Sequence, residues 1–155
     1  MRYSKLIYSL PFKKSTKIKI CDAPYHKTSK SMENCIDFYM PEGTPILSAK
    51  EGIALEVVDQ YHKSYKKPGF AAKSNLICIN HKNNERSIYV HLKHDSARIK
   101  EGDLVKTGQV IASSGKTGYA TYPHLHFGVY SNKENLKPRL KGLNSITFKN
   151  HKAFE

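Results

Sequence analysis

The stretch Pro123-His124-Leu125-His126-Phe127-Gly128-Val129 places two histidines two residues apart among residues that favour β-strands. In a strand, residues i and i+2 project to the same face, so His124 and His126 are expected side by side. Leu125 and Phe127 then face the other way. Imidazole is the commonest protein ligand of transition metals and the commonest general base. The stretch therefore predicts a strand that carries chemistry on one face.

The other apolar segments are also short, and none keeps a 3.6-residue apolar period over three turns. Many short strands separated by turn signals are typical of a mainly β domain, here an antiparallel sandwich or open barrel with long loops. The segment 59–75 is expected to be a long basic loop. Strands are expected at residues 3–10, 17–21, 35–39, 45–49, 53–58, 76–80, 87–92, 102–105, 108–112, from 124 onwards and at 146–148.

The length and net charge of the chain limit the number of domains and the kinds of partner that it can have. The 155 residues suffice for one domain with its own core, and no linker or repeat divides them. The 26 Lys and Arg outnumber the 13 Asp and Glu, which gives a net charge of +13. This charge favours an anionic partner, such as nucleic acid, acidic lipid or an acidic cell-wall polymer, and it also suits a basic solubilising surface. No nucleic-acid-binding motif accompanies it.

The cysteines and the N-terminus carry weaker signals. Cys78 lies in an apolar run and is expected to be a buried free thiol, whereas a disulfide between Cys21 and Cys35 is an open alternative. Residues 1–10 contain no uninterrupted apolar segment of the kind that a signal peptide needs, and no apolar run in the sequence is long enough to span a membrane.

A catalytic zinc site takes three ligands from His, Asp, Glu or Cys and leaves one position open. Asp37 is a candidate third ligand beside the histidine pair because it lies between Ile36 and Phe38, and a buried carboxylate needs a partner. It can instead face solvent on a half-exposed strand. His91 also lies in a strand-like segment. A solvated surface position is expected for the four histidines that lie among Lys and Asn, namely His62, His81, His94 and His151.

Five separate motifs resemble, in order, the lysostaphin/LytM-type zinc endopeptidases that cleave peptidoglycan peptides. They cover most of the chain, from about residue 26 to residue 130. The motifs are Asp37-Phe38; Gly43-Thr44-Pro45 with Ala49 and Gly52; Tyr89-Val90-His91-Leu92; the glycine-spaced run Gly102-Asp103-Leu104-Val105 to Gly108-Gln109-Val110-Ile111-Ala112 with Ser114-Gly115 and Thr117-Gly118; and Pro123-His124-Leu125-His126-Phe127.

The resemblance implies one zinc ion held by Asp37, His126 and an upstream histidine. His26 is the sole histidine before Asp37 and takes that role, although ten residues lie between the two. A loop can close such a gap at little entropic cost. Glu33 is the alternative ligand, since it stands where the family often has a histidine separated from the aspartate by three residues. The resemblance makes His91 and His124 catalytic residues that do not bind the metal. Which of the two is the base and which stabilises the oxyanion stays open.

The implied function is a zinc metalloendopeptidase that hydrolyses peptide bonds of peptidoglycan with metal-activated water. The implied organisation is one monomeric domain, residues 1–155, with a peptidase core at about 26–130, an N-terminal β extension and a basic C-terminal tail. Its partners would be peptidoglycan or its peptides and anionic wall polymers, but no specific nucleic acid. It would act at the cell wall, in the periplasm or outside the cell, although this sequence shows no signal peptide.

Two other functions are considered. A catalytically inactive LytM-like module that binds or activates another cell-wall hydrolase would lose ligands or catalytic histidines, whereas candidates for all five positions are present here. The glycine-spaced hairpin from Val105 to Ala112 also resembles biotinyl or lipoyl carriers, with Lys50 in an exposed turn as the modified residue. A carrier has no need of His91, His124 and His126.

Overall fold

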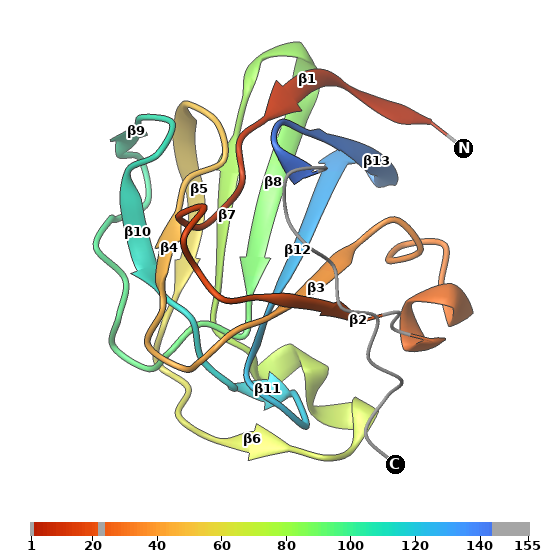
Figure 1. The fold of residues 1–155 in the computed structure, drawn as a ribbon. Coiled ribbons are helices and arrows are strands. Elements are labelled where there is room, and N and C mark those ends of the chain that lie inside the picture. Colours follow the sequence, from red (N-terminus) through yellow and green to blue (C-terminus); the bar gives the residue numbers. More distant parts are fainter. Residues whose placement is uncertain (1, 22–23, 144–155) are drawn as a thin grey trace.

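The computed structural model describes residues 2–21 and 24–143. It confirms a mainly β chain, with one large curled sheet and two short two-stranded sheets (Figure 1). No helix in the described part of the chain is long and apolar enough to cross a bilayer. The helices are three short 3₁₀ turns, η1 (Pro24–Thr28), η2 (Pro68–Lys73) and η3 (Lys82–Asn84). The strands are β1 (Tyr3–Tyr8), β2 (Lys19–Cys21), β3 (Ile36–Tyr39), β4 (Pro45–Leu47), β5 (Gly52–Val58), β6 (Ser64–Tyr65), β7 (Leu76–Asn80), β8 (Glu85–Val90), β9 (Leu104–Val105), β10 (Val110–Ser113), β11 (Gly118–Tyr119), β12 (His124–Ser131) and β13 (Glu134–Leu140).

The strand that contains the two histidines, β12, lies at the centre of the large sheet. The strand order is β1-β13-β12-β8-β7-β5-β9, and β3 also pairs with β12 and carries β2 on its other edge. Leu125 and Phe127 are fully buried in the core, where Phe127 contacts the rings of Phe38 and Tyr89 at centroid distances of 6.5 and 5.4 Å. The predicted alternation of β12 is therefore confirmed, because its apolar residues pack inwards and leave the histidines on the opposite face.

Two pairs of strands differ from the expected antiparallel arrangement. β1 pairs with β13 in parallel, and β6 pairs with β11 in parallel. Parallel neighbours need a long connection, which both pairs have because their strands are far apart in the sequence. The buried Glu85 holds β1 in place: its carboxylate accepts hydrogen bonds from the backbone N–H groups of Lys5 and Leu6 and from the Tyr8 hydroxyl.

The basic tail expected after Ser131 contains a strand that sequence patterning missed. β13 pairs with β12 only over Glu134–Leu136, and its second half pairs with β1. Pro138 has no N–H, but the flanking N–H groups of Lys137 and Arg139 donate to Arg2 O and Ser4 Oγ. The proline is therefore tolerated in this half of the strand. The strand expected at 146–148 lies outside the described residues.

Candidate active site

The register of β3 against β12 brings Asp37 beside the histidine pair. In this antiparallel pairing Asp37 lies opposite His126, and Tyr39 lies opposite His124. Directly opposed residues project to the same face of a sheet, so all four side chains share the face away from the core. Asp37 is 6% exposed, which excludes the solvated position that the sequence left open for it.

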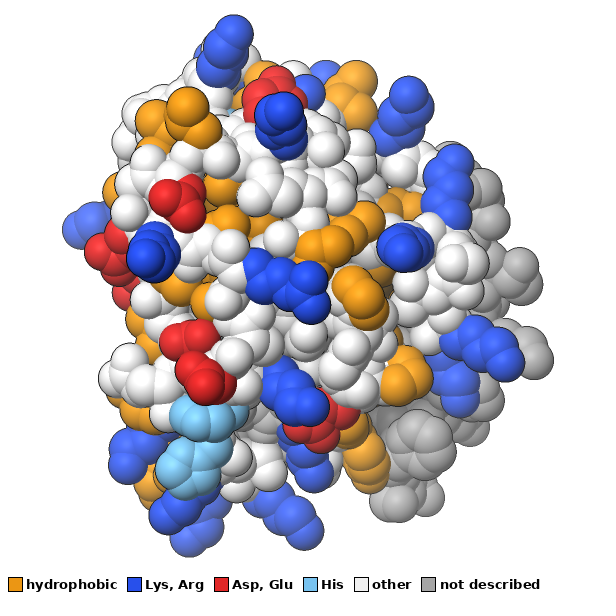
Figure 2. Space-filling model, turned by 90° about the vertical axis from the view of Figure 1, so that its left-hand side faces the viewer, with side chains coloured by type: hydrophobic (Ala, Val, Ile, Leu, Met, Phe, Trp, Pro, Cys, Tyr) orange, Lys and Arg blue, Asp and Glu red, His pale blue; other side chains and the backbone are white. Residues whose placement is uncertain are grey.

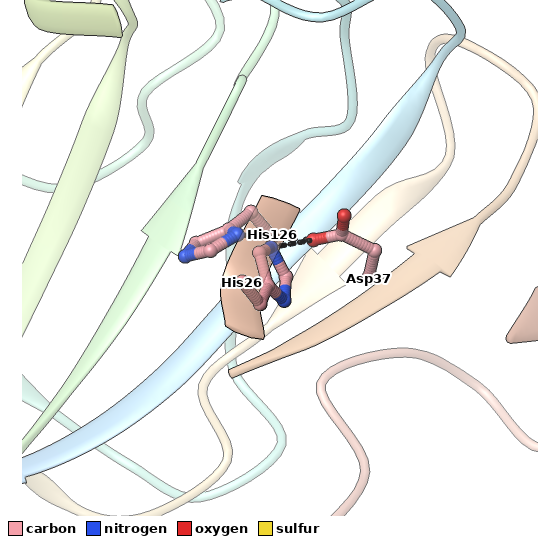
Figure 3. Close-up of side chains that lie close together, drawn as sticks. All are labelled: His26, Asp37 and His126. Carbon is pink, nitrogen blue, oxygen red and sulfur yellow. Dashed lines mark hydrogen bonds and ion pairs between the residues drawn. The ribbon is translucent and has the colours of Figure 1, made fainter. Parts of the chain in front are cut away.

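His26, from the short helix η1, completes a cluster of three buried side chains with Asp37 and His126 (Figure 3). One potential ligand atom from each residue lies within 4.8 Å of the other two. His26 Nε2 is 3.3 Å from Asp37 Oδ1, and His126 Nδ1 is 3.0 Å from the same oxygen. Glu33 is exposed and is not a member of this cluster, so the structure brings His26, and not Glu33, to Asp37.

The cluster fits a zinc ion by its chemistry and by its spacing. Zinc with bonds of about 2.0–2.2 Å to nitrogen and oxygen keeps its ligand atoms about 3.3 Å apart in a tetrahedron. The two distances to Asp37 Oδ1, 3.3 and 3.0 Å, match that separation. Two imidazoles and one carboxylate form a common set of catalytic zinc ligands and leave a fourth position open.

Three histidines of the site are fixed by backbone carbonyls. His26 Nδ1 donates to Cys35 O at 3.2 Å, His91 Nδ1 to Thr117 O at 2.7 Å, and His124 Nδ1 to Tyr122 O at 2.7 Å. A carbonyl only accepts, so each Nδ1 carries a proton, and in the neutral imidazole Nε2 keeps its lone pair. His26 Nε2 can therefore ligate a metal, while the Nε2 atoms of His91 and His124 can accept protons.

His91 and His124 lie together beside the ligand cluster. Their ring centroids are 4.6 Å apart, and His124 Nε2 is 3.7 Å from Asp37 Oδ2. Tyr39 stacks on the His124 ring at 5.2 Å. His91 follows the last residue of β8 with φ of 66°, in the left-handed region that few residues other than glycine adopt. Such a backbone conformation at a buried polar residue is typical of functional positions.

Burial and mutual contacts set the charge state of these groups. Burial would raise the pKa of Asp37, but hydrogen bonds with His126 and His26 lower it well below its usual range, so the carboxyl stays ionised. Burial, together with the nearby His124 and His126, lowers the pKa of His91 to about 3. Burial also lowers the pKa of His124, against the opposing charge of Asp37. His91 and His124 are thus neutral near pH 7.

The long connection between His26 and Asp37 is held by β12 and β13. The Asn34 N–H and side-chain amide donate to Asn135 Oδ1 and Asn135 O at 2.7 and 3.0 Å. The Tyr130 hydroxyl donates to Ser31 O at 2.7 Å. These bonds fix the segment that carries His26. Cys35, at the end of that segment, is a buried free thiol, so it does not form the disulfide that the sequence left open.

Buried polar groups to which the sequence analysis assigned no role support His91. Thr117 Oγ1 donates to Leu92 O at 2.9 Å and accepts from the Asn75 N–H at 3.0 Å. The Asn75 side chain also donates to Leu92 O, at 3.1 Å. These bonds join the residue after His91 to Thr117, whose carbonyl accepts from His91 Nδ1. The sequence signals for these groups were the Thr117-Gly118 motif and an Asn directly before the apolar strand β7.

The expectation of a solvated surface position is wrong for His81. It is 7% exposed, and its two ring nitrogens contact Glu51 O and Ser87 Oγ at 2.7 and 2.8 Å. His62 and His94 are exposed, as expected, and their rings lie 5.5 Å apart. His151 lies outside the described residues. Cys78 is the buried free thiol that the sequence predicts.

Comparison with known proteins shows which family and which relatives this chain resembles. Residues 31–138 match peptidase family M23. The glycyl-glycine endopeptidase ALE-1 of Staphylococcus capitis is 31% identical over 77% of this chain and 33% of its own length. The peptidoglycan DD-endopeptidase ShyB of Vibrio cholerae is 38% identical over 62% of this chain and 20% of its own. The chain thus spans a fifth to a third of the length of these relatives.

Two solved structures share the fold. A zinc-containing peptidase from Vibrio cholerae superposes with a TM-score of 0.60 at 28% identity, over 82% of this chain and 37% of that one. The catalytic domain of the antimicrobial peptidase lysostaphin from Staphylococcus simulans superposes with a TM-score of 0.52 at 33% identity, over 67% of this chain and 74% of that one. Both similarities agree with the mainly β architecture.

Proposed function

The chain belongs to peptidase family M23, with relatives of the lysostaphin type, and we propose that it is a zinc-dependent endopeptidase that hydrolyses peptide bonds in bacterial peptidoglycan. The observation that carries this proposal is the convergence of His26, Asp37 and His126 beside two neutral histidines. The proposed peptidase core, about residues 26–130, forms one domain with the flanking strands.

In this proposal His26 Nε2, Asp37 Oδ1 and His126 Nδ1 hold one zinc ion. Bound there, zinc would act as a Lewis acid that polarises the scissile carbonyl and activates a water molecule as the nucleophile. The carbonyls that fix the histidines are outer partners of the kind that orient ligands at such sites. The ionised Asp37 supplies the negative charge that a divalent cation requires.

His124 is the better candidate for the general base. Its Nε2 lone pair is free, and the Asp37 carboxylate at 3.7 Å stabilises the cation that forms when it takes the proton of the attacking water. The same proton can then pass to the leaving amine. His91 is a weaker base because burial depresses its pKa more strongly. We assign it the role of accepting a hydrogen bond through Nε2 from water or from the scissile amide.

Zinc content and hydrolysis of purified peptidoglycan, measured together, test this function. The wild type should hold one zinc ion per chain and release peptides. His126→Ala should lose both properties, and His124→Ala should keep the zinc but lose hydrolysis. The exposed His62 provides the matched control, since His62→Ala should keep both.

Two results would overturn the proposal. A folded wild type with a zinc content near zero would favour the inactive module that binds or activates another hydrolase. A zinc-loaded wild type that cleaves no peptidoglycan from several bacterial types would also contradict it.

A further inference from the structure

A cationic and aromatic cluster, formed by Tyr65, Phe70 and Lys73, lies at the end of the molecule that carries the active site. The rings of Tyr65 and Phe70 stack with centroids 4.1 Å apart and planes 6° apart. The Lys73 Nζ lies 5.9 and 5.5 Å from the two centroids, within cation–π range. Both rings are half-buried, while Lys73 is exposed. The ammonium group is thus held near a rigid aromatic surface and remains open to solvent.

Backbone contacts tie this cluster to His91. Tyr65 in β6 pairs with Tyr119 in β11, and the Gly118 N–H donates to Lys63 O at 2.9 Å. Gly118 directly follows Thr117, whose carbonyl accepts from His91 Nδ1. On the other side, Lys73 directly precedes Ser74, whose hydroxyl lies 3.4 Å from His91 Nδ1. Figure 1 shows β6 and β11 together below the lower end of β12, where the histidine pair begins.

The segment that forms the cluster carries charge of one sign. Between Gln60 and Asn75 the chain has no Asp or Glu, and it carries the lysines Lys63, Lys66, Lys67 and Lys73. None of these lysines takes part in an ion pair within the described residues. Figure 2 shows Lys or Arg side chains at the lower end of the face it presents, the end where β6 and η2 lie in Figure 1.

We propose that Lys73 binds a carboxylate of the substrate peptide beside the scissile bond, so that the enzyme prefers carboxylate-bearing wall peptides to neutral oligoglycine. This inference rests on the proposed endopeptidase function and assigns its substrate class.

The stacked rings explain why this lysine differs from its neighbours. A lysine side chain that extends freely into solvent loses conformational entropy when it binds an anion. Contact with Tyr65 and Phe70 already restricts the Lys73 side chain, so its loss is smaller. A hydrogen bond from an ammonium to a carboxylate is stronger than one between neutral groups, and with the exposed ammonium already oriented by the rings it corresponds to about a tenfold effect. Its strength should fall as salt is added.

The experiment uses the zinc-loaded full chain and paired peptides. One is a cross-linked stem peptide with free carboxylates, and the other is the same peptide with those carboxylates converted to amides. The wild type should cleave the carboxylate form with a kcat/KM about tenfold higher at low salt. Lys73→Gln should reduce this preference to about one, and Lys73→Arg should retain most of it. Lys106→Gln is the control, since it removes one charge from an exposed turn next to β9, far from η2 in Figure 1.

Calorimetric binding of the stem peptide and of its amide to the zinc-loaded His124→Ala variant, which should not cleave them, gives a readout that does not depend on hydrolysis. This variant should bind the carboxylate form about tenfold more tightly, and the same variant with Lys73→Gln should bind both alike. Equal cleavage of the two forms by the wild type, with equal binding in the presence of Lys73, would refute the subsite and leave the endopeptidase intact. A preference that persists in Lys73→Gln would also refute it. A zinc-loaded protein that cleaves neither form refutes the proposed function instead. The ratio of the affinities for the carboxylate peptide and its amide then still tests the role of Lys73.

Discussion

Asn34 and Asn135 exchange two hydrogen bonds across 101 residues of sequence: the Asn34 N–H donates to Asn135 Oδ1, and Asn34 Nδ2 donates to Asn135 O. Asn34 precedes Cys35, whose carbonyl accepts from His26 Nδ1. The pair therefore fixes the segment that delivers His26 to Asp37. Asn135 is 5% exposed, so its own side chain has few alternative partners.

Asn135→Ala is expected to weaken zinc binding by about tenfold, at the lower end of the range for residues that orient metal ligands. It also leaves the Asn34 N–H without its partner, which costs about 1–3 kcal/mol of stability. Competition with a chelator measures the affinity, and thermal unfolding measures the stability. Asn80→Ala, at an exposed strand end, should change neither. Unchanged zinc affinity in a destabilised Asn135→Ala protein would show that the pair is structural only.

Zinc binding is expected to release about one proton from His126. Burial lowers the pKa of His126, but its hydrogen bond with Asp37 and its contacts with Cys35 raise the pKa to about 10 in the metal-free protein. The proton must leave before Nδ1 can ligate the metal, so apparent affinity should rise about tenfold per pH unit below pH 10. Calorimetry in buffers of different ionisation enthalpy counts the protons. Affinity that does not vary between pH 6 and 8 would contradict this account.

The same group predicts how pH changes the stability of the metal-free protein. The folded-state pKa of His126 lies above its ordinary value near 6.5. Its protonated form therefore adds stability that is fully present below about pH 6.5 and is lost as the pH rises towards 10. Denaturant unfolding of the wild type and of His126→Gln, both without metal, measures this. The slope with pH in that window should be smaller in the variant, and equal slopes would refute the assignment.

Thr117→Val is expected to lower kcat about tenfold and leave zinc content unchanged. Valine has a similar shape but can neither donate to Leu92 O nor accept from the Asn75 N–H, so the carbonyl that holds His91 loses its support. Steady-state hydrolysis and metal analysis separate the two effects. Thr107→Val removes a hydroxyl that bonds to the exposed Glu51 and should have no effect on kcat. A loss of zinc in Thr117→Val would mean that the ligand cluster itself depends on this threonine.

Glu85→Ala is expected to destabilise the protein by about 3 kcal/mol or more and to leave zinc affinity unchanged. The substitution leaves the buried Tyr8 hydroxyl and two N–H groups of β1 without their acceptor. Chemical denaturation measures the loss, and Glu134→Ala is the control because its ion pair with Arg2 is half-exposed. Equal losses from the two substitutions would show that Glu85 does not hold β1.

Sequence patterning indicated the candidate residues of the site better than the way they are held. The alternation of β12 predicted that His124 and His126 share one face of the strand, whereas the sequence left Asp37 either beside them or on a solvent face. Their juxtaposition follows from the register of β3 on β12, which no local pattern specifies. His26 was found only because it is the sole upstream histidine. The hydrogen bonds from β12 and β13 that close its loop are contacts between distant segments.

The remaining errors of the sequence-based predictions, the burial of His81 and the strand β13, have a common physical cause. His81 lies among polar residues in the sequence but is buried because Glu51 O, from the turn before β5, and Ser87 Oγ, from β8, satisfy its ring nitrogens. β13 contains Pro138 and three charged residues, and it is a strand because β1 and β12 both pair with it. In each case a distant partner overrides the local propensity.

Mass spectrometry of the soluble products of a peptidoglycan digest tests the central claim most directly. The zinc-loaded wild type should release peptide fragments that carry one new amino terminus and one new carboxyl terminus per cut, with the glycan strands intact. A chelator should abolish the products, and added zinc should restore them. Intact peptidoglycan after incubation with the zinc-loaded protein, or products cut only within the glycan strands, would contradict the claim.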